Sequence, residues 1–436
     1  MARLSVTTQS SQPSGLEAAN AILSLARELQ PICRSITGDG LRKTLQILGR
    51  ELPLTMHEVP SGTAVLDWTV PNEWNIRDAY IKNAQGERVI DFQTCSLHVI
   101  NYSTPVKATL IRAELEPHLH SDPDRPDAIP YKTSYYREAW GFCLSHNQRN
   151  KLGDGPFEIC IDSSLKPGAL TYAELIVPGS QPDEFLVSTH CCHPYMANDN
   201  LSGIGLSVQL AKRLLKSQPR LTYRFLFIPG TIGPITWLAL NDSSRVRHGL
   251  VLTCLGDAGA FTYKKTRLGN AVIDRVASHV LRHSGSAFAM EDFVPYGYDE
   301  RQYNSPGFKL PVGALMRTAN GRYPQYHTSD DNLDFIRPEA LAGSYDVLCS
   351  FIDVFEHDGK FLNLNPRGEP QLGKRGLYDG PQEETMALLW VLSFSDGAFS
   401  LLDIAERANV PFARIKGAAE RLKATGLLRR LGENER

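Results

Sequence analysis

The sequence predicts an α/β fold, and the main observation behind this prediction is an alternation of strands and helices from about residue 165 onward. Apolar stretches such as 184–189 (EFLVST) and 223–230 (YRFLFIPG) are short and uninterrupted, as in strands buried on both faces. Helical patterns follow them, for instance 202–217 (SGIGLSVQLAKRLLKS). Strands that alternate with helices in this way form a mainly parallel sheet. The chain has 436 residues, which predicts two or three domains.

Changes in local composition and periodicity along the chain predict where the domains begin and end. Between residues 61 and 160, short aromatic and β-branched stretches separated by turn residues predict a β-rich inserted domain. A Gly/Pro-rich linker at 361–380 precedes three helical patterns and a basic strand, which predict a winged helix-turn-helix at 376–436. The α/β domain is therefore expected to be discontinuous and to cover residues 15–60 and 161–370.

Bulk composition narrows the classes of function. The formal net charge of −2 gives no sign of a general affinity for nucleic acid or acidic membranes. The eight cysteines form no CxxC pair, which favours a reduced, cytoplasmic setting. The polar first residues (MARLSVTTQSSQPSG) lack the apolar core of a signal peptide and are interpreted as a disordered lead-in. No run of eighteen apolar residues occurs, so no membrane span is predicted.

Imidazole and carboxylate side chains follow the predicted strands. His190 ends the strand EFLVST, Asp199 lies in the turn ANDNLSG before a helix, Asp257 ends VLTCLGD, and His327 lies in YPQYHTSDDNLDFI. In open α/β sheets, ligands gather at the carboxyl ends of strands. Histidine and aspartate are ligands that zinc binds in proteins, and such a site can leave one coordination position for water. A bound divalent ion lowers the pKa of that water. The sequence therefore predicts a metal site at this edge of the sheet.

Two histidines compete for the first ligand position. His190 lies at the end of the predicted strand. His193 lies in a turn that a proline stiffens, and it is closer to Asp199 in the sequence. The sequence favours His193 slightly, and both are kept as candidate ligands.

The motifs ANDNLSG, a later strand-end aspartate and YHTSDDNLD resemble those of the co-catalytic zinc aminopeptidases. The phrases SGTAVLDWTVPNEWNIRDAYI, PYKTSYYREAWGFCLSH, FIPGTIG and RYPQYHTSDDNLDFI more closely resemble aminopeptidase-like proteins of bacterial gene clusters for surface polysaccharides and related metabolites. This resemblance covers nearly all of the chain after residue 20. It implies a zinc-aminopeptidase-like (phosphorylase/hydrolase-like) mixed sheet flanked by helices, with one or two zinc ions and a C-terminal winged helix.

The resemblance also assigns roles to single residues. Asp199 matches the bridging aspartate of the family, Asp257 the aspartate of one metal position, and His327 the histidine of the other. A Glu-Glu pair, which supplies the family's general base and a further ligand, is expected near FIPGTIG. The chain has Gly230 and Thr231 there instead.

These departures weaken the expectation of a dinuclear site with the usual base. Cys192 stands two positions after His190, where the family has an aspartate. One metal ion is the simpler model. The segment YGYDERQYNSPGF, where the family builds its substrate pocket, offers Glu300 and Asp299 as replacement bases, and Glu300 could instead bind a substrate amine.

Each candidate also has an interpretation without chemistry. Asp199 could be a simple helix cap, since Asn, Asp and Ser cap helices routinely. The order and spacing of Asp257 and His327 favour metal binding over that interpretation. Cys191 and Cys192 could suggest a nucleophile, but adjacent strand residues point to opposite sides. A buried structural cysteine is the commoner case.

The C-terminal helical pattern at 411–426 raises a different function. It carries Arg414, Lys416, Arg421 and Lys423, and a winged helix can place such a helix in the major groove of DNA. Dimerisation or substrate recognition would suit the module equally well.

The sequence thus predicts a cytoplasmic, zinc-dependent hydrolase of an amide or peptide-like bond, with Asp199, Asp257 and His327 as ligands alongside His193 or His190. Its expected partner is a small-molecule or peptide-like substrate, and a homo-oligomer is compatible with the sequence. The resemblance implies a setting in surface-polysaccharide or specialised metabolite biosynthesis. Two alternatives stay open: a binding protein that has lost turnover, and a DNA-linked regulator.

Overall fold

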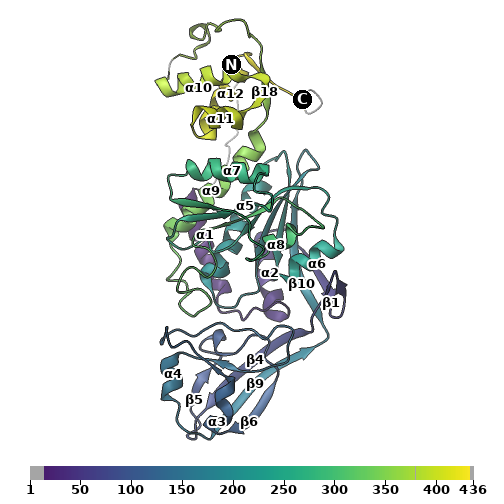
Figure 1. The fold of residues 1–436 in the computed structure, drawn as a ribbon, viewed down its shortest axis with the longest axis vertical. Coiled ribbons are helices and arrows are strands. Elements are labelled where there is room, and N and C mark those ends of the chain that lie inside the picture. Colours follow the sequence, from purple (N-terminus) through teal and green to yellow (C-terminus); the bar gives the residue numbers. More distant parts are fainter. Residues whose placement is uncertain (1–13, 379, 433–436) are drawn as a thin grey trace, which may run out of the picture. The chain divides into compact units, whose positions relative to one another are not determined.

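The structure is a computed structural model that describes residues 14–378 and 380–432 (Figure 1). The predicted disordered lead-in falls almost entirely outside these residues. The chain divides into two compact units. The first unit runs to Gly269 and resumes at Glu291–Asp346, and the second comprises Asn270–Met290 and the chain from Val347 onward. Among the described residues, no helix has the length and apolarity needed to span a membrane.

A mixed sheet forms the centre of the first unit. Its strands follow the order β1 (Thr55–Pro60), β10 (Ala169–Val177), β12 (Thr222–Ile228), β11 (Glu184–His190), β13 (Val246–Leu252), β16 (Val312–Met316) and β14 (Phe261–Lys264). The four central strands, β12, β11, β13 and β16, are parallel, and β1, β10 and β14 are antiparallel to their neighbours. All residues of β11 are buried, as its uninterrupted apolar sequence predicts. The predicted α/β class is confirmed.

Helices cover this sheet, and their close approach depends on small residues. The N-terminal helices α1 (Gly15–Leu29) and α2 (Asp39–Glu51) pack with α5 (Gly203–Leu215) against the sheet (Figure 1). A Cβ atom at Gly205 would lie 2.5 Å from Cγ2 of Ile22 in α1. The short helices α6 (Ile232–Leu240) and α8 (Glu300–Tyr303) contribute Trp237 and Tyr303 to the apolar core.

The β-rich insertion has a small sheet and a core of its own. The sheet order is β5 (Arg88–Asp91), β4 (Glu73–Lys82), β9 (Phe157–Lys166) and β6 (Val106–Leu110). The insertion also contains the two-residue strands β7 (Leu119–His120) and β8 (Phe142–Cys143), which pair with each other, and the short helices α3 (Arg112–Leu115) and α4 (His146–Lys151). The paired strands β2 (Ala64–Val65) and β3 (Trp68–Thr69) lie within the expected bounds of the insertion, but β2 contacts α6 of the α/β domain.

One stretch of the insertion differs from its β-like composition. Residues 97–103 (LHVINYS) form the end of a 3₁₀ turn and then two isolated bridges, Val99 to Phe142 and Asn101 to Thr133. The side chain of Asn101 donates to the carbonyl oxygen of Arg34 and accepts from Ser35. These long-range contacts hold the stretch as an irregular connection, which its composition could not reveal.

The second unit contains the predicted three-helix module: α10 (Gln382–Phe394), α11 (Leu401–Ala408) and α12 (Phe412–Ala424). Its three-stranded sheet has the order β18 (Asp396–Ser400), β17 (Lys360–Asn363) and β19 (Leu428–Arg430). The prediction of a linker beginning at residue 361 is wrong at its start, because Phe361 is buried in β17 and pairs with Arg430. This unit also holds α7 (Val272–Arg282), whereas β15 (Phe288–Glu291) and α9 (Pro338–His357) cross the division between the units.

Adding one methyl group at Gly205 should destabilise the protein, because Ile22 is fully buried and occupies the space. Gly205→Ala should lower the free energy of unfolding by about 1–3 kcal/mol. Gly49→Ala is the matched control: Gly49 lies in α2, and a Cβ atom there meets nothing within 4 Å. It should raise stability by about 0.5–1 kcal/mol through helix propensity. Chemical denaturation measures both, and equal effects of the two changes would contradict the packing argument.

Candidate metal site

The turn between β11 and α5 brings three potential metal ligands together. His190 ends β11, and His193 and Asp199 follow within the same buried connection. Nε2 of His190 lies 2.8 Å from Oδ1 of Asp199, and the two histidine rings are 4.7 Å apart between centroids. One ligand atom from each residue lies within 4.8 Å of the others. Both candidate histidines thus lie next to Asp199, and the geometry excludes neither as a ligand.

His327 approaches the same carboxylate from the other side. Its Nε2 lies 3.1 Å from Oδ2 of Asp199, and its ring stacks on Tyr326 with centroids 3.9 Å apart. Its side chain is 33% exposed, whereas that of Asp199 is 2% exposed. Asp199 therefore has one oxygen facing His190 and the other facing His327, and the His327 side chain is the more exposed partner of the latter pair.

The charge states of this cluster suit coordination. Burial raises the pKa of Asp199, but hydrogen bonds with His190 and His327 favour its ionised form, and the pKa lies well below its ordinary value. Burial lowers the pKa of His193 well below its ordinary value, so its imidazole is neutral near pH 7 and has a free lone pair. An ionised carboxylate beside neutral imidazole is the donor set that zinc takes in proteins.

A second aspartate holds the turn in place. Asp331 accepts hydrogen bonds from the backbone N–H groups of Ala197, Asn198 and Asp199, and one from the hydroxyl of Tyr323. Burial raises the pKa of Asp331 to about 7. The DNLD segment after His327 therefore positions the turn that carries Asp199, a role that the sequence did not reveal.

Asp257 lies beside this cluster but does not join it. Its Oδ1 accepts from Thr318 Oγ1 (2.6 Å) and from Gly259 N (2.7 Å). Its Oδ2 accepts from Asn198 Nδ2 (3.0 Å) and from Thr318 N (3.3 Å). Four donors thus occupy the carboxylate, which anchors Asn198 in the turn instead of pointing a free oxygen at the histidines.

Glu300 is likewise engaged elsewhere. Its carboxylate is 2.7 Å from Nζ of Lys264 in a buried ion pair, and it accepts from the backbone N–H of Tyr298. Its neighbour Asp299 is the less engaged of the two candidate bases. Oδ1 of Asp299 accepts from Thr231 N (2.6 Å), and Oδ2 is buried without a hydrogen-bond partner in the described part of the chain. Burial raises the pKa of Asp299 to about 8.

Tyr298 occupies the place that the missing glutamate side chain would need. A Cβ atom at Gly230 would lie 1.9 Å from the hydroxyl oxygen of Tyr298. The Tyr298 ring lies 4.2 Å from that of His190 between centroids. Tyr298 in this position therefore requires glycine at position 230. The sequence placed Tyr298 in the pocket segment but could not show that it fills this space.

The two cysteines have the properties of buried structural thiols. Cys192 Sγ accepts from the Gly230 N–H at 3.2 Å and lies 3.6 Å from Nδ1 of His193. Burial raises the pKa of Cys192 to about 12 and that of Cys191 well above its ordinary value. Both are protonated at neutral pH, so neither is an activated nucleophile.

The insertion and the N-terminal loop also reach the site. The Tyr131 ring lies 5.3 Å from that of His193 and 5.2 Å from that of His327 between centroids, and its hydroxyl bonds to that of Tyr135 (3.0 Å). Arg34 donates from Nε to the carbonyl oxygen of His193 (2.9 Å). The sequence signal for these residues was only the aromatic density of PYKTSYYREAW and the polar loop PICRSITGDG.

Comparison with known proteins identifies the family. Residues 23–358 match the family model described as "Domain of unknown function (DUF4910)", and residues 360–430 match a winged helix-turn-helix model. The chain belongs to the DUF4910 family. A relative from Clostridium acetobutylicum is 50% identical over 422 residues, which cover 95% of this chain and 97% of the relative. It carries the provisional name "polysaccharide biosynthesis protein with aminopeptidase-like domain".

Solved structures confirm the aminopeptidase-like fold of this DUF4910 member. The crystal structure of a provisionally assigned peptidase from Clostridium acetobutylicum has a TM-score of 0.92 at 49% identity and covers 96% of this chain and 97% of its own. A zinc aminopeptidase from Bacillus subtilis has a TM-score of 0.55 at 14% identity, covering 79% and 95%. An aminopeptidase from Aneurinibacillus sp. strain AM-1 has a TM-score of 0.50 at 12% identity, covering 78% and 93%. The latter two share the fold alone.

The buried carboxyl of Asp299 should make stability depend on pH. Its pKa is about 8 in the folded chain against an ordinary value of 3.8, so unfolding releases a proton between these values. The free energy of unfolding should therefore fall as pH rises from about 5 to about 8. Asp299→Asn should flatten this dependence, whereas the surface control Asp334→Asn should keep it. Urea unfolding at several pH values measures the slopes, and an unchanged slope in Asp299→Asn would refute the assignment.

Proposed function

We propose that the protein is a metal-dependent hydrolase of an amide or peptide-like bond, with zinc as the metal. The observation that carries this proposal is the buried convergence of His190, His193 and Asp199 at the carboxyl edge of the parallel strands. His327 would complete the site as a fourth ligand from its more exposed side. When bound, such an ion polarises a carbonyl and lowers the pKa of a water molecule. Asp257 would act one step away, by fixing Asn198 and the turn.

Side chains of the protein would supply proton transfer, hydrogen bonding to the reacting carbonyl and exclusion of water. Asp299 would exchange the proton of the attacking water, because a carboxyl with a pKa of about 8 can take up and release a proton near neutrality. Burial holds the pKa of Tyr298 well above its ordinary value, so its hydroxyl stays protonated and can donate to the oxygen of the reacting carbonyl. Tyr131 and Tyr326 would exclude water on either side of His327.

The setting follows from the relatives by analogy. The name of the Clostridium acetobutylicum relative supports a role in polysaccharide biosynthesis. A small-molecule or peptide-like substrate carrying an amide, handled in the cytoplasm, fits this setting and the zinc aminopeptidase fold.

A second function, ligand binding without turnover, has one specific observation in its favour. Gly230 and Thr231 replace the glutamate pair, and the Tyr298 hydroxyl fills the space that a side chain at position 230 would need. A site that binds metal and substrate but lacks an effective base would have this appearance.

Metal content and hydrolysis test the proposal together. The wild-type protein, purified without chelators and supplied with zinc, should hold about one ion per chain. His190→Ala and Asp199→Ala should each lower the affinity for zinc by at least about tenfold. Asp334→Asn is the matched control, because Asp334 lies in the same segment as Asp331 but is exposed, and this variant should retain the ion.

The same preparations are then assayed on a panel of aminoacyl and acyl amides. Asp299→Asn should lower kcat by about 10²-fold or more while zinc stays bound. Zinc binding without turnover on any amide would establish the binding protein instead. No zinc in the supplied wild-type protein would refute the metal site itself.

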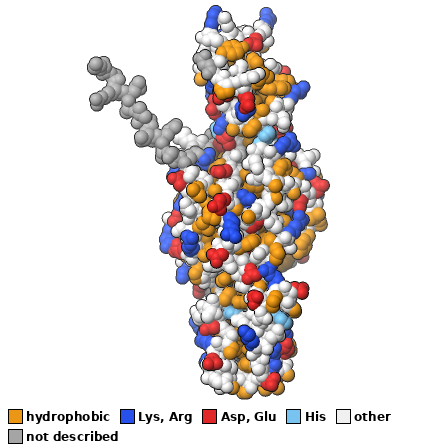
Figure 2. Space-filling view, turned by 90° about the vertical axis from the view of Figure 1, so that its left-hand side faces the viewer, with side chains coloured by type: hydrophobic (Ala, Val, Ile, Leu, Met, Phe, Trp, Pro, Cys, Tyr) orange, Lys and Arg blue, Asp and Glu red, His pale blue; other side chains and the backbone are white. Residues whose placement is uncertain are grey.

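The winged-helix module has few free positive charges with which to bind DNA. In α12, Arg414 pairs with Glu383 (2.7 Å), Arg421 with Glu384 (2.9 Å) and Lys416 with Asp353 (2.7 Å). The sheet is also unusual, since β17, which precedes α10, lies between β18 and β19. In the described residues no hairpin follows α12 to serve as a wing. Figure 2 shows both signs of charge interspersed over the face in view.

We therefore expect no specific binding of duplex DNA by this module. Binding of a labelled duplex should be weak and should vanish as salt rises from about 50 to about 200 mM. The double variant Glu383→Gln, Glu384→Gln releases Arg414 and Arg421 and should strengthen binding measurably. Fluorescence anisotropy gives both affinities. Tight, salt-resistant binding by the wild-type protein would support the regulator instead.

A further inference from the structure

Arg34, in the loop between α1 and α2, is a charged side chain that is completely buried. Its Nε donates to the carbonyl oxygen of His193 (2.9 Å), and its Nη1 donates to that of Leu29, the last residue of α1. Its remaining nitrogen, Nη2, is buried without a hydrogen-bond partner among the described residues. The guanidinium group therefore bridges the end of a helix and the turn that carries the candidate metal ligands.

In the described part of the chain, no carboxylate acts on this buried charge. The ionisable groups that favour the charged form of Arg34 are the thiols of Cys191, Cys33 and Cys192 and the hydroxyl of Tyr131. Burial raises the pKa of each of these four groups well above its ordinary value, so all are uncharged near pH 7. Burial also lowers the pKa of Arg34 to about 10, which leaves the guanidinium group charged and without a counter-ion.

A purely structural role for Arg34 would be to cap α1, since a cation near a helix C-terminus is favourable. A side chain at the surface could do this and stay hydrated, whereas an unpaired charge loses its hydration when it is buried. The carbonyl oxygen of His193 belongs to a buried turn, so a donor that reaches it must be buried as well. The bond to His193, and not the bond to α1, therefore accounts for the burial of the charge.

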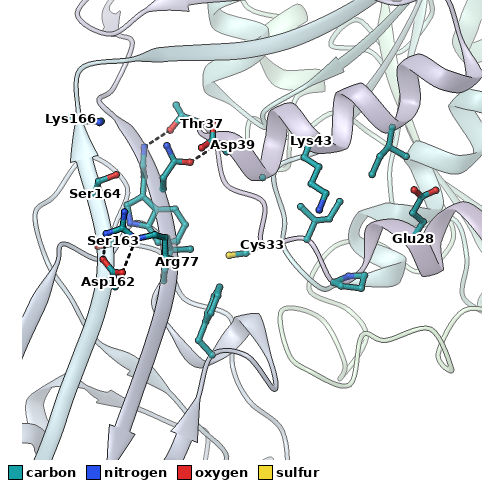
Figure 3. A pocket seen from close by; sticks show the side chains of 18 residues that line it. Glu28, Cys33, Thr37, Asp39, Lys43, Arg77, Asp162, Ser163, Ser164 and Lys166 are labelled. Atoms are coloured by element: carbon teal, nitrogen blue, oxygen red, sulfur yellow. Dashed lines mark hydrogen bonds and ion pairs between the residues drawn. The ribbon is translucent and has the colours of Figure 1, made fainter.

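The inserted domain fixes the backbone of the same loop. Asn101 donates from Nδ2 to the carbonyl oxygen of Arg34 (2.9 Å). Three residues further on, the hydroxyl of Thr37 accepts from the backbone N–H of Trp74 (3.0 Å). Figure 3 shows Thr37 at the edge of the cavity that lies between this loop and the inserted sheet. The backbone of Arg34 is thus held from the side of the insertion, while its side chain holds the turn of the candidate ligands.

We propose that Arg34 is a positioning residue of the metal site, which holds the backbone of His193 and thereby sets where the imidazole lies. The inference rests on the proposed function, because it requires a metal ion at His190, His193 and Asp199. Arg34 itself contacts neither the ion nor a substrate and acts through His193. Groups that hydrogen-bond metal-ligating residues typically change the metal affinity by about 10–100-fold when they are mutated.

The zinc affinity of the full chain, measured in competition with a chelating indicator, tests the proposal. Arg34→Met should weaken zinc binding by about tenfold or more. Arg34→Lys keeps the charge but not the planar fork that serves two carbonyl oxygens, so its affinity should lie between those of Arg34→Met and the wild-type protein. Arg42→Met is the matched control: Arg42, in α2, pairs with Glu58 and Glu73 away from the ligands, and this variant should bind zinc like the wild-type protein.

Cobalt substitution gives a second readout, which a merely structural role would not change. The visible absorption of bound Co²⁺ depends on the geometry of its ligands, so its bands should change in Arg34→Met and stay the same in Arg42→Met. Urea unfolding of the metal-free proteins shows that each variant is folded and measures its loss of stability separately.

An Arg34→Met protein that is less stable but binds zinc and Co²⁺ like the wild-type protein would show that Arg34 only supports the fold, and would overturn the proposal. If Arg34→Met does not fold, Arg34→Lys decides, and an unchanged affinity and spectrum in that variant contradict the proposal in the same way. Absence of zinc from the supplied wild-type protein is a different outcome, because it refutes the metal site and this inference together.

Discussion

The buried carboxylate of Asp199 is the constraint on which the site and much of its surroundings depend. An ionised carboxylate that is almost fully removed from water needs compensation by hydrogen bonds and opposite charge. His190 and His327 contact its two oxygens, and His193 lies within the same cluster. Three backbone N–H groups of the turn are in turn held by Asp331. The geometry of the candidate metal site is thus built into the packing between β11 and α5.

The aromatic side chain of Tyr298 fills the space beside Gly230, at the end of β12. Gly230 provides the space that the Tyr298 hydroxyl occupies, and Thr231 donates its N–H to Asp299. The carboxyl group of Asp299 therefore lies beside the end of β12 and is fully buried. Burial raises its pKa, which is the opposite of what a hydrogen-bonded, exposed carboxylate would show.

The inserted domain contacts the candidate site and the α1–α2 loop. Tyr131 contacts two histidines of the site, and Trp74 donates from its indole to Ser103 while its backbone bonds to Thr37. The α1–α2 loop lies between these elements, with Arg34 bonded to the turn of the metal site. One loop thereby joins the inserted sheet, the cavity beside it and the candidate ligands.

The sequence by itself determined the fold class, the β-rich insertion and the three-helix C-terminal module, because local periodicity and turn residues report on elements directly. It also identified His190, His193, Asp199 and His327, which follow strands or precede a helix. The tertiary structure decided what these residues face. The contacts that decide this join segments far apart in the chain. Thr318 occupies an oxygen of Asp257, Lys264 pairs with Glu300, and Tyr298 fills the space at Gly230. No periodicity reports such contacts, since they arise only when the elements pack.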